Sequence, residues 1–450
     1  MVPASQIQDQ IEPYAAEFER FDRAAGAAQP PWLRELRQRA VSSFSENGFP
    51  TTRDEAWRFT NVTPIARSAF VPAPAGAFAM TRARLDGLVP AIPGAVRLVL
   101  VNGRYAREIS EVAAVPTGVT VRGLAEALAA DPDGLAPHLG RVARFDRHAF
   151  GALNTAFLGD GIVVEIAAAQ IVEEPIHIVY VSAAGAEPTV AHPRALVISG
   201  EHSQSRIVET FVSLGDARHF TNSVSEFIVG PGAVVDHFRL ELENRRAYHL
   251  GGTSARLARA SVFSSFAGAF GGEIVRNDVV AVLDGEGADC TLNGVTIADG
   301  GALVDHHTEI DHATAHCTSH EVYKSILGGA ARGVFNGRIR VRPDAQKTDA
   351  KQTNKTLLLS DDAQVNTKPE LQILANDVKC THGATVGRLN EEQWFYLRAR
   401  GIGREEARAM LIKAFAGEVV NRIGPPGVRE AIEGLLSSRL GRMDLGGAQS

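Results

Sequence analysis

Residues 287–330 read GADCTLNGVTIADGGALVDHHTEIDHATAHCTSHEVYKSILGGA, in which short β-branched segments alternate with small turn residues. The pairs Gly287-Ala288, Gly301-Ala302 and Gly329-Ala330 mark turns, and comparable pairs continue as far as Gly383-Ala384. From residue 287 onward, successive pairs are separated by 14, 28, 15, 18 and 21 residues. This loose period persists for about 100 residues without a convincing helix, which is typical of a solenoid whose coils cover one another's apolar faces.

The same alternation of short strands and turn residues begins near residue 157, where Gly161–Ile166 and Ile176–Val181 are the first clear strands, and it lasts to residue 388. A β-sandwich or jelly roll would also give many short strands and glycine-rich turns. The recurrence of the turns favours a parallel β-helix, although the pattern alone leaves the other two folds open. We therefore predict a mainly β core at residues 157–388.

Helices are predicted before this core, in an N-terminal domain at residues 1–156. Apolar residues at steps of three and four indicate helices at 7–21 and 32–44, and Asn47-Gly48 ends the second one. A strand at 96–101 and a helix near 124–130 make this domain a mixed α/β unit.

A C-terminal helical domain is predicted at residues 389–440. Asn390 is a good N-cap for a helix that runs to Gly401, and a second helix starts near Arg404. A third helix covers Val428–Leu440, and residues 441–450 are expected to form a disordered tail. The buried stripe expected for the second helix consists of Ala407, Met410, Leu411, Ala414, Phe415 and Val419.

Composition excludes several classes of function. The chain has 46 basic and 52 acidic residues, a net charge of −6, which argues against binding nucleic acid. No stretch approaches 18 uninterrupted apolar residues, and no basic segment followed by an apolar run is visible near the start, so neither a membrane span nor a secretory signal is expected. The three cysteines form no C-x-x-C pair, which favours reduced thiols and a cytoplasmic protein.

Enzyme signatures are missing as well. The sequence contains no Walker A phosphate loop, no G-x-S-x-G nucleophile elbow and no H-E-x-x-H metal helix. We therefore expect a chain without catalytic activity of its own.

One candidate site is the histidine-rich segment 306–320, which holds five of the chain's 14 histidines. Imidazole, thiolate and carboxylate are all ligands for zinc or iron, and His312, His316 and Cys317 are the candidate metal ligands. In strand geometry His306, His312, His316 and His320 would share one face, with His307 and Cys317 on the other. Histidines that serve the structure are the favoured interpretation of this segment.

A second candidate is the pair Cys380 and His382 in the segment Asp377–Gly383. If this segment is a strand, both side chains project from the same face, roughly 7 Å apart along the chain. Two ligands do not complete a site, because iron–sulfur clusters commonly use four protein ligands. The pair would be a half-site that another subunit completes, while the alternative is a small cysteine packed in the core.

Several of these segments resemble the SufB/SufD family of iron–sulfur cluster assembly proteins, and the resemblance spans most of the chain. Segment 378–383 resembles the SufD branch of the family rather than the SufB branch, which would be expected to carry its main cluster-building cysteine in a different C-terminal segment. The segments that carry the resemblance are Arg53–Thr60, Asp311–Lys324, Arg332–Gly337, Gln352–Ser360, Leu374–Gly387 and Leu389–Gly403.

The resemblance implies a right-handed parallel β-helix between helical ends. It also implies assembly with the paralogue SufB through residues 360–385 and with the ATPase SufC through helices at 391–420. In the family, the nascent cluster forms at the SufB–SufD interface, which makes Cys380 and His382 its expected binding residues here. No tightly bound cofactor is expected on the isolated chain, which we expect to form a homodimer. His306 and His320 match no family position and are given no role.

Two other functions stay open at this stage. A β-helical carbohydrate-active enzyme would need acidic and basic residues that converge in a groove, and the sequence shows no clear cluster of this kind. A stand-alone metal-binding protein would use the histidines at 306–320.

Overall fold

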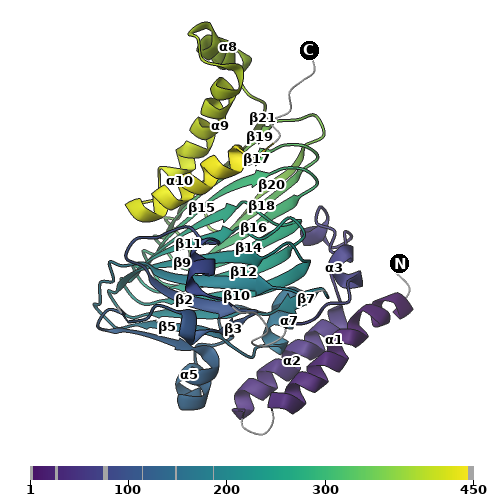
Figure 1. The fold of residues 1–450 in the computed structure, drawn as a ribbon. Helices are drawn as coiled ribbons and strands as arrows, with labels where there is room; N and C mark the ends of the chain where they lie inside the picture. Colours follow the sequence, from purple (N-terminus) through teal and green to yellow (C-terminus); the bar gives the residue numbers. More distant parts are fainter. Residues whose placement is uncertain are drawn as a thin grey trace.

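The centre of the computed structural model is a stack of parallel β-coils, with helices at both ends of the chain (Figure 1). The structure describes residues 4–25, 29–73, 80–113, 115–146, 149–185 and 187–443. Most of the predicted C-terminal tail, residues 444–450, lies outside the described residues. None of the helices in the described ranges is both long and apolar enough to cross a membrane.

Two sheets share the strands of the solenoid, and from β8 onward successive strands of the chain alternate between them. Neighbouring strands within each sheet are parallel throughout the core, which confirms the β-helix and excludes the sandwich and the jelly roll. Sheet A contains β1 (Val71–Pro72), β4 (Val119–Gly123), β5 (Gly161–Ile166), β7 (Thr189–Ala191), β8 (Arg194–Ser199), β10 (His219–Val229), β12 (Tyr248–Leu257), β14 (Ile274–Leu283), β16 (Leu303–His312), β18 (Arg332–Val341) and β20 (Gln364–Ile373). Sheet B contains β2 (Val96–Val101), β3 (Arg104–Tyr105), β6 (Ile176–Ala183), β9 (Gln204–Leu214), β11 (Val234–Glu241), β13 (Val262–Ala269), β15 (Asp289–Ala298), β17 (Thr318–Leu327), β19 (Asp349–Leu358) and β21 (Lys379–Gly387).

The coil length explains the loose period of the turn residues. Cys290, Ser319, Ala350 and Cys380 are successive register partners in sheet B, at intervals of 29, 31 and 30 residues. Each coil contains one strand of each sheet and two turns, so turns recur at about half a coil. Gly383-Ala384 was predicted to be a turn, but this pair lies inside β21.

The N-terminal region packs helices against the first coils and also contributes strands to them. The predicted helices and the strand β2 are present, and β2 pairs in parallel with β6 of the core. Because β2 belongs to a core sheet, the structure does not separate the N-terminal region from the core at residue 156, and the predicted domain boundaries stay a prediction. The helical segments of this region are α1 (Ala4–Ala25), α2 (Pro31–Asn47), η2 (Glu55–Trp57), α3 (Thr63–Arg67), α4 (Arg82–Asp86), η3 (Arg107–Ile109), α5 (Leu124–Ala130), α6 (Pro132–Leu135) and α7 (Ala149–Ala156).

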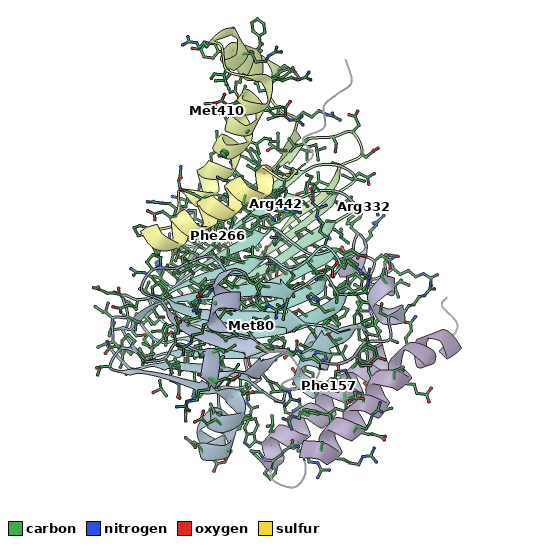
Figure 2. The ribbon with its side chains drawn as sticks, viewed as in Figure 1. Met80, Phe157, Phe266, Arg332, Met410 and Arg442 are labelled. Atoms are coloured by element: carbon green, nitrogen blue, oxygen red, sulfur yellow. The ribbon has the colours of Figure 1, made fainter. Side chains whose placement is uncertain are left out.

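Three C-terminal helices follow the last coil, namely α8 (Glu391–Ala399), α9 (Arg404–Val420) and α10 (Pro426–Leu440). Asn390 caps α8 by accepting a hydrogen bond from the Gln393 amide, and Gly401 has the positive φ expected after a helix. The outer face of sheet B packs on α9 and α10 through a cluster that includes Ile326 and Ile412. Figure 2 shows Phe266 of β13 beneath α10.

The predicted buried stripe of α9 was wrong in part. Met410 and Ala414 are exposed, whereas Ile412, Ala416 and Val420 are buried. Met410 lies on the part of α9 that extends away from the sheets (Figure 2). The register of the stripe depends on which face of α9 meets sheet B, and the helical period alone does not determine that face.

Charged side chains fill part of the interior of the solenoid. The Arg239 guanidinium donates to the Glu241 carboxylate at 2.7 Å and lies 4.3 Å from the centre of the Phe211 ring. Burial would raise the pKa of Glu209, but the hydrogen bond from His237 and the charges of His237 and Arg239 lower it to about 2. Gly251 leaves room for this network, since a Cβ there would collide with the Arg239 guanidinium.

Candidate functional site

The last coil of the solenoid has an open end. β20 and β21 pair with β18 and β19 on one side, and within the described residues no strand pairs with their other edges. Large apolar side chains are exposed there, with 40% of Ile373, 51% of Leu374 and 49% of Val386 accessible to solvent. An unpaired strand edge with exposed apolar residues is a template for pairing with another chain.

Cys380 and His382 both lie on β21, at this open end. Cys380 is the register partner of Ala350, and His382 is the register partner of Gln352. The Cys380 side chain packs against the buried cluster of Ile339, Val341, Ala345 and Ala350, so it faces the interior of the coil. His382 is two residues further along the strand and therefore on the same face, but it is exposed because no further coil covers it.

The thiol of Cys380 is held in its neutral form in the isolated chain. Partial burial raises its pKa, the negative charge of Asp349 raises it further, and a backbone hydrogen bond from Ala350 lowers it. Only a thiolate ligates iron well, so binding to a metal would displace the thiol proton. Cys380 and His382 together offer one sulfur and one nitrogen donor, which is half of a four-ligand set.

The structure does not bring the other three predicted ligands together. His312 points into the coil, where its Nε2 lies 2.9 Å from the Ser319 hydroxyl. Cys317 is buried, and its thiol lies 3.4 Å from the Gly285 carbonyl oxygen. His316 is in the turn between β16 and β17 with φ 60°, and its side chain is exposed. Among the described residues, no group of three or more histidine, cysteine or acidic side chains could hold a metal ion.

The structure also places some of these histidines on other faces than the sequence predicts. The chain turns between His312 and Thr318, so one strand does not run through the whole segment. His306 is inside the coil, 2.9 Å from the Thr296 hydroxyl, whereas His320 belongs to the outer face of sheet B. The alternation expected for a continuous strand therefore holds within β16, where His306 and His312 face inward and His307 faces outward, but not beyond the turn.

The segment Arg53–Thr60 was given no functional role from the sequence. The structure places it on the outer face of sheet A. The Trp57 ring lies 3.7 Å from the Arg276 guanidinium, and that guanidinium also pairs with Asp305 at 3.0 Å. Glu55 forms an ion pair with Lys368 of β20, so this segment reaches the last coil. Trp57 was the available signal, but its partner Arg276 lies 219 residues further along the chain.

Helix α8 carries a second exposed surface. Phe395 is 72% exposed and Tyr396 is 56% exposed, and α8 has no buried residue among those described. The helix packs mainly against α9 and extends away from the coils (Figure 1). Two large exposed aromatic side chains on one short helix suit a contact with another protein.

Comparison with known proteins gives consistent matches over nearly the whole chain. The family model described as SUF system FeS cluster assembly, SufBD core domain, matches residues 180–415, and the SufBD protein N-terminal region matches residues 8–178. The iron–sulfur cluster assembly protein SufD of Escherichia coli is 31% identical over 94% of this chain and 96% of its own length. An iron–sulfur cluster assembly SufBD family protein of Synechocystis is 31% identical over 86% of each chain. SufD of Bacillus subtilis is 26% identical over 66% of this chain and 68% of its own length.

Proposed function

Because this chain belongs to the SufBD family of iron–sulfur cluster assembly proteins, we propose that it is a scaffold subunit of the Suf assembly complex. In this proposal it pairs with SufB, and a nascent cluster forms where the two chains meet. The chain supplies ligands and a surface for assembly, and it performs no catalysis itself.

The single observation that carries the proposal is the place of Cys380 and His382 at the open end of the solenoid. Both face the interior of a coil that no further described strand covers. A SufB chain that continued the two sheets through residues 360–385 would bring its own ligands opposite this half-site. Iron or the growing cluster is then the cargo of the interface, bound transiently and not tightly by the isolated chain.

The ATPase of the complex is expected to bind through residues 391–420. The sequence has no phosphate-binding loop, so the ATPase activity must come from a partner such as SufC. The exposed aromatic side chains of α8 are a suitable surface for that contact. We further propose that the chain is cytoplasmic, where thiols stay reduced, and that it forms a homodimer through the same open end when SufB is absent.

Substitution of His382 tests the proposal. His382→Ala should leave folding intact, because the side chain is exposed, yet lower cluster formation when SufB and SufC are co-expressed. Loss of a ligand should cost at least as much as loss of a residue that orients one, about tenfold or more. The measurement is iron and acid-labile sulfide in the complex purified without oxygen.

His320→Ala is the matched control, because His320 is a histidine on the outer face of sheet B. A complex that carries His382→Ala and still assembles a normal amount of cluster would remove His382 from the mechanism. Acidic and basic side chains do converge in a groove over sheet A, at Asp278, Glu309, Asp311, Arg340 and Arg342, but the family shown by the comparisons is one of cluster assembly proteins. A stand-alone metal-binding protein is favoured by no cluster of metal ligands among the described residues.

A further inference from the structure

A column of side chains runs through the interior of the last coils and ends at His382. Leu292, Glu321, Gln352 and His382 are successive register partners on β15, β17, β19 and β21. Neighbouring strands of a sheet are about 4.8 Å apart, so each side chain in the column lies directly over the one before it. Gln352 is therefore the residue immediately beneath His382.

The side-chain amide of Gln352 is held in place from two sides. Its Nε2 donates a hydrogen bond of 2.6 Å to the carboxylate of Glu321, and the whole residue is only 2% exposed. Gly337 of sheet A faces it across the interior, and a Cβ on Gly337 would collide with the Gln352 amide. The absence of a side chain at Gly337 gives the amide the space that it occupies.

The oxygen of the same amide lacks a donor. Gln352 Oε1 is buried and accepts no hydrogen bond from the described residues. Leaving a buried polar group without a hydrogen bond is unfavourable, so such an oxygen usually has a partner in the working state of a protein. The next residue outward in the column is His382, whose ring can donate an N–H.

Glu321 anchors the side-chain amide of Gln352. Burial raises the pKa of Glu321 to about 7, and the neighbouring Thr308 and Gln352 side chains lower it only in part. A buried carboxyl of this kind depends on its hydrogen-bond donors. Rotation of the Gln352 amide away from Glu321 would therefore be unfavourable.

We propose that Gln352, anchored by Glu321, positions the imidazole of His382 by accepting a hydrogen bond from one ring nitrogen. The other ring nitrogen is then left unprotonated and available to the nascent cluster. A histidine that ligates a metal commonly donates its second N–H to a neighbouring oxygen in this way. The inference rests on the proposed function, in which His382 is a ligand, and Gln352 is a positioning residue that does not touch the cluster.

The test compares two buried amides on the same strand. Gln352→Met removes the amide beneath His382 and keeps the shape of the side chain. Asn354→Leu is the matched control, because Asn354 is also buried with an unsatisfied amide oxygen, but its register partner is Ala384. Cluster formation with SufB and SufC should fall about tenfold in Gln352→Met and stay near the wild-type level in Asn354→Leu.

A second readout needs neither partner nor cluster. In the isolated full-length chain labelled with ¹⁵N-histidine, the two ring nitrogens of His382 should show one dominant tautomer, and Gln352→Met should reduce that preference. His382→Ala identifies the signals. If Gln352→Met does not fold, Gly337→Ala makes the same test, because its methyl group would displace the amide without removing it.

The possible outcomes separate the two proposals. Normal cluster formation in His382→Ala would contradict the proposed function, whatever the tautomer shows. Loss of cluster formation in His382→Ala, together with unchanged cluster formation and an unchanged His382 tautomer when Gln352 is replaced or displaced, would overturn the positioning role alone.

Discussion

Glu321 is an acidic residue that is buried inside the solenoid. Its side chain faces the interior with Tyr323 and Gln352, whereas Lys324 of the same strand faces outward to α9. The strand places acidic and polar side chains inside, where hydrogen bonds replace water. Residues of this kind make the stability of the chain depend on pH.

Substitution of Glu321 should change that dependence. Its carboxyl ionises near 4.5 in the unfolded chain but only near 7 in the fold. The raised pKa means that its contribution to stability is complete below about pH 4.5 and is lost as pH rises through about 7. Relative to the wild type, Glu321→Gln should therefore become more stable between about pH 5 and pH 8, by on the order of 3 kcal/mol.

Urea unfolding of both chains across this range measures the difference in free energy. Glu430→Gln on the exposed face of α10 serves as the control and should show no such trend. A constant difference between Glu321→Gln and the wild type at all pH values would show that the interior carboxyl ionises as it does in water.

At the scale of elements, the C-terminal helices divide into an anchored part and a free part. Lys324 of β17 reaches α9, where its ammonium donates to the Phe415 carbonyl oxygen at 2.7 Å and pairs with Glu418. α9 is thereby tied to sheet B near its C-terminal end. α8 has no comparable anchor among the described contacts to the coils, and it presents Phe395 and Tyr396 to solvent.

Replacing both exposed aromatic residues of α8 should weaken the proposed contact with SufC. Phe395→Ser combined with Tyr396→Ser removes no buried packing, so the melting temperature should stay close to that of the wild type. Since interface aromatic residues often contribute about 2 kcal/mol each, the dissociation constant for SufC should rise at least about tenfold. Isothermal titration of purified SufC into the chain measures it.

Phe59→Ser is the control for this experiment. Phe59 is 45% exposed but lies on the outer face of sheet A, in the segment that contacts the coils near Lys368. Equal affinity of SufC for the α8 double variant and the wild type would place the ATPase elsewhere on the chain.

At the scale of the whole molecule, the two ends of the solenoid differ. The first coils carry the N-terminal helices and the antiparallel strands β3 and β4, whereas within the described residues no further strand pairs with the outer edges of β20 and β21 (Figure 1). A stack of coils is stable only where each apolar face meets another. The open end is therefore the part of the molecule that most requires a second chain.

Charges introduced at this end should separate the proposed homodimer. Leu374→Asp combined with Val386→Asp puts carboxylates where apolar side chains are now exposed, so the isolated chain should sediment as a monomer of 48.0 kDa. Ile171→Asp is the control, because Ile171 is 57% exposed but belongs to the opposite end of the stack. A dimer that persists in the double variant would show that the chains associate through another surface.

Local sequence predicted much of this molecule. The cap at Asn390, the strand at 96–101 and the placement of Cys380 and His382 on one face all follow from interactions within a few residues of chain. The sequence motifs also identified the family, which the comparisons with known proteins confirm.

Only the tertiary structure decided which residues of different coils contact one another. The sequence by itself determined that Cys380 and His382 share a face, because side chains alternate along a strand with a period of two. It did not determine that Gln352 lies beneath His382, that Gly337 makes space for it, or that Trp57 stacks on Arg276. These contacts join residues from about 15 to more than 200 positions apart, and their register depends on the length of every turn between them, which no local pattern encodes.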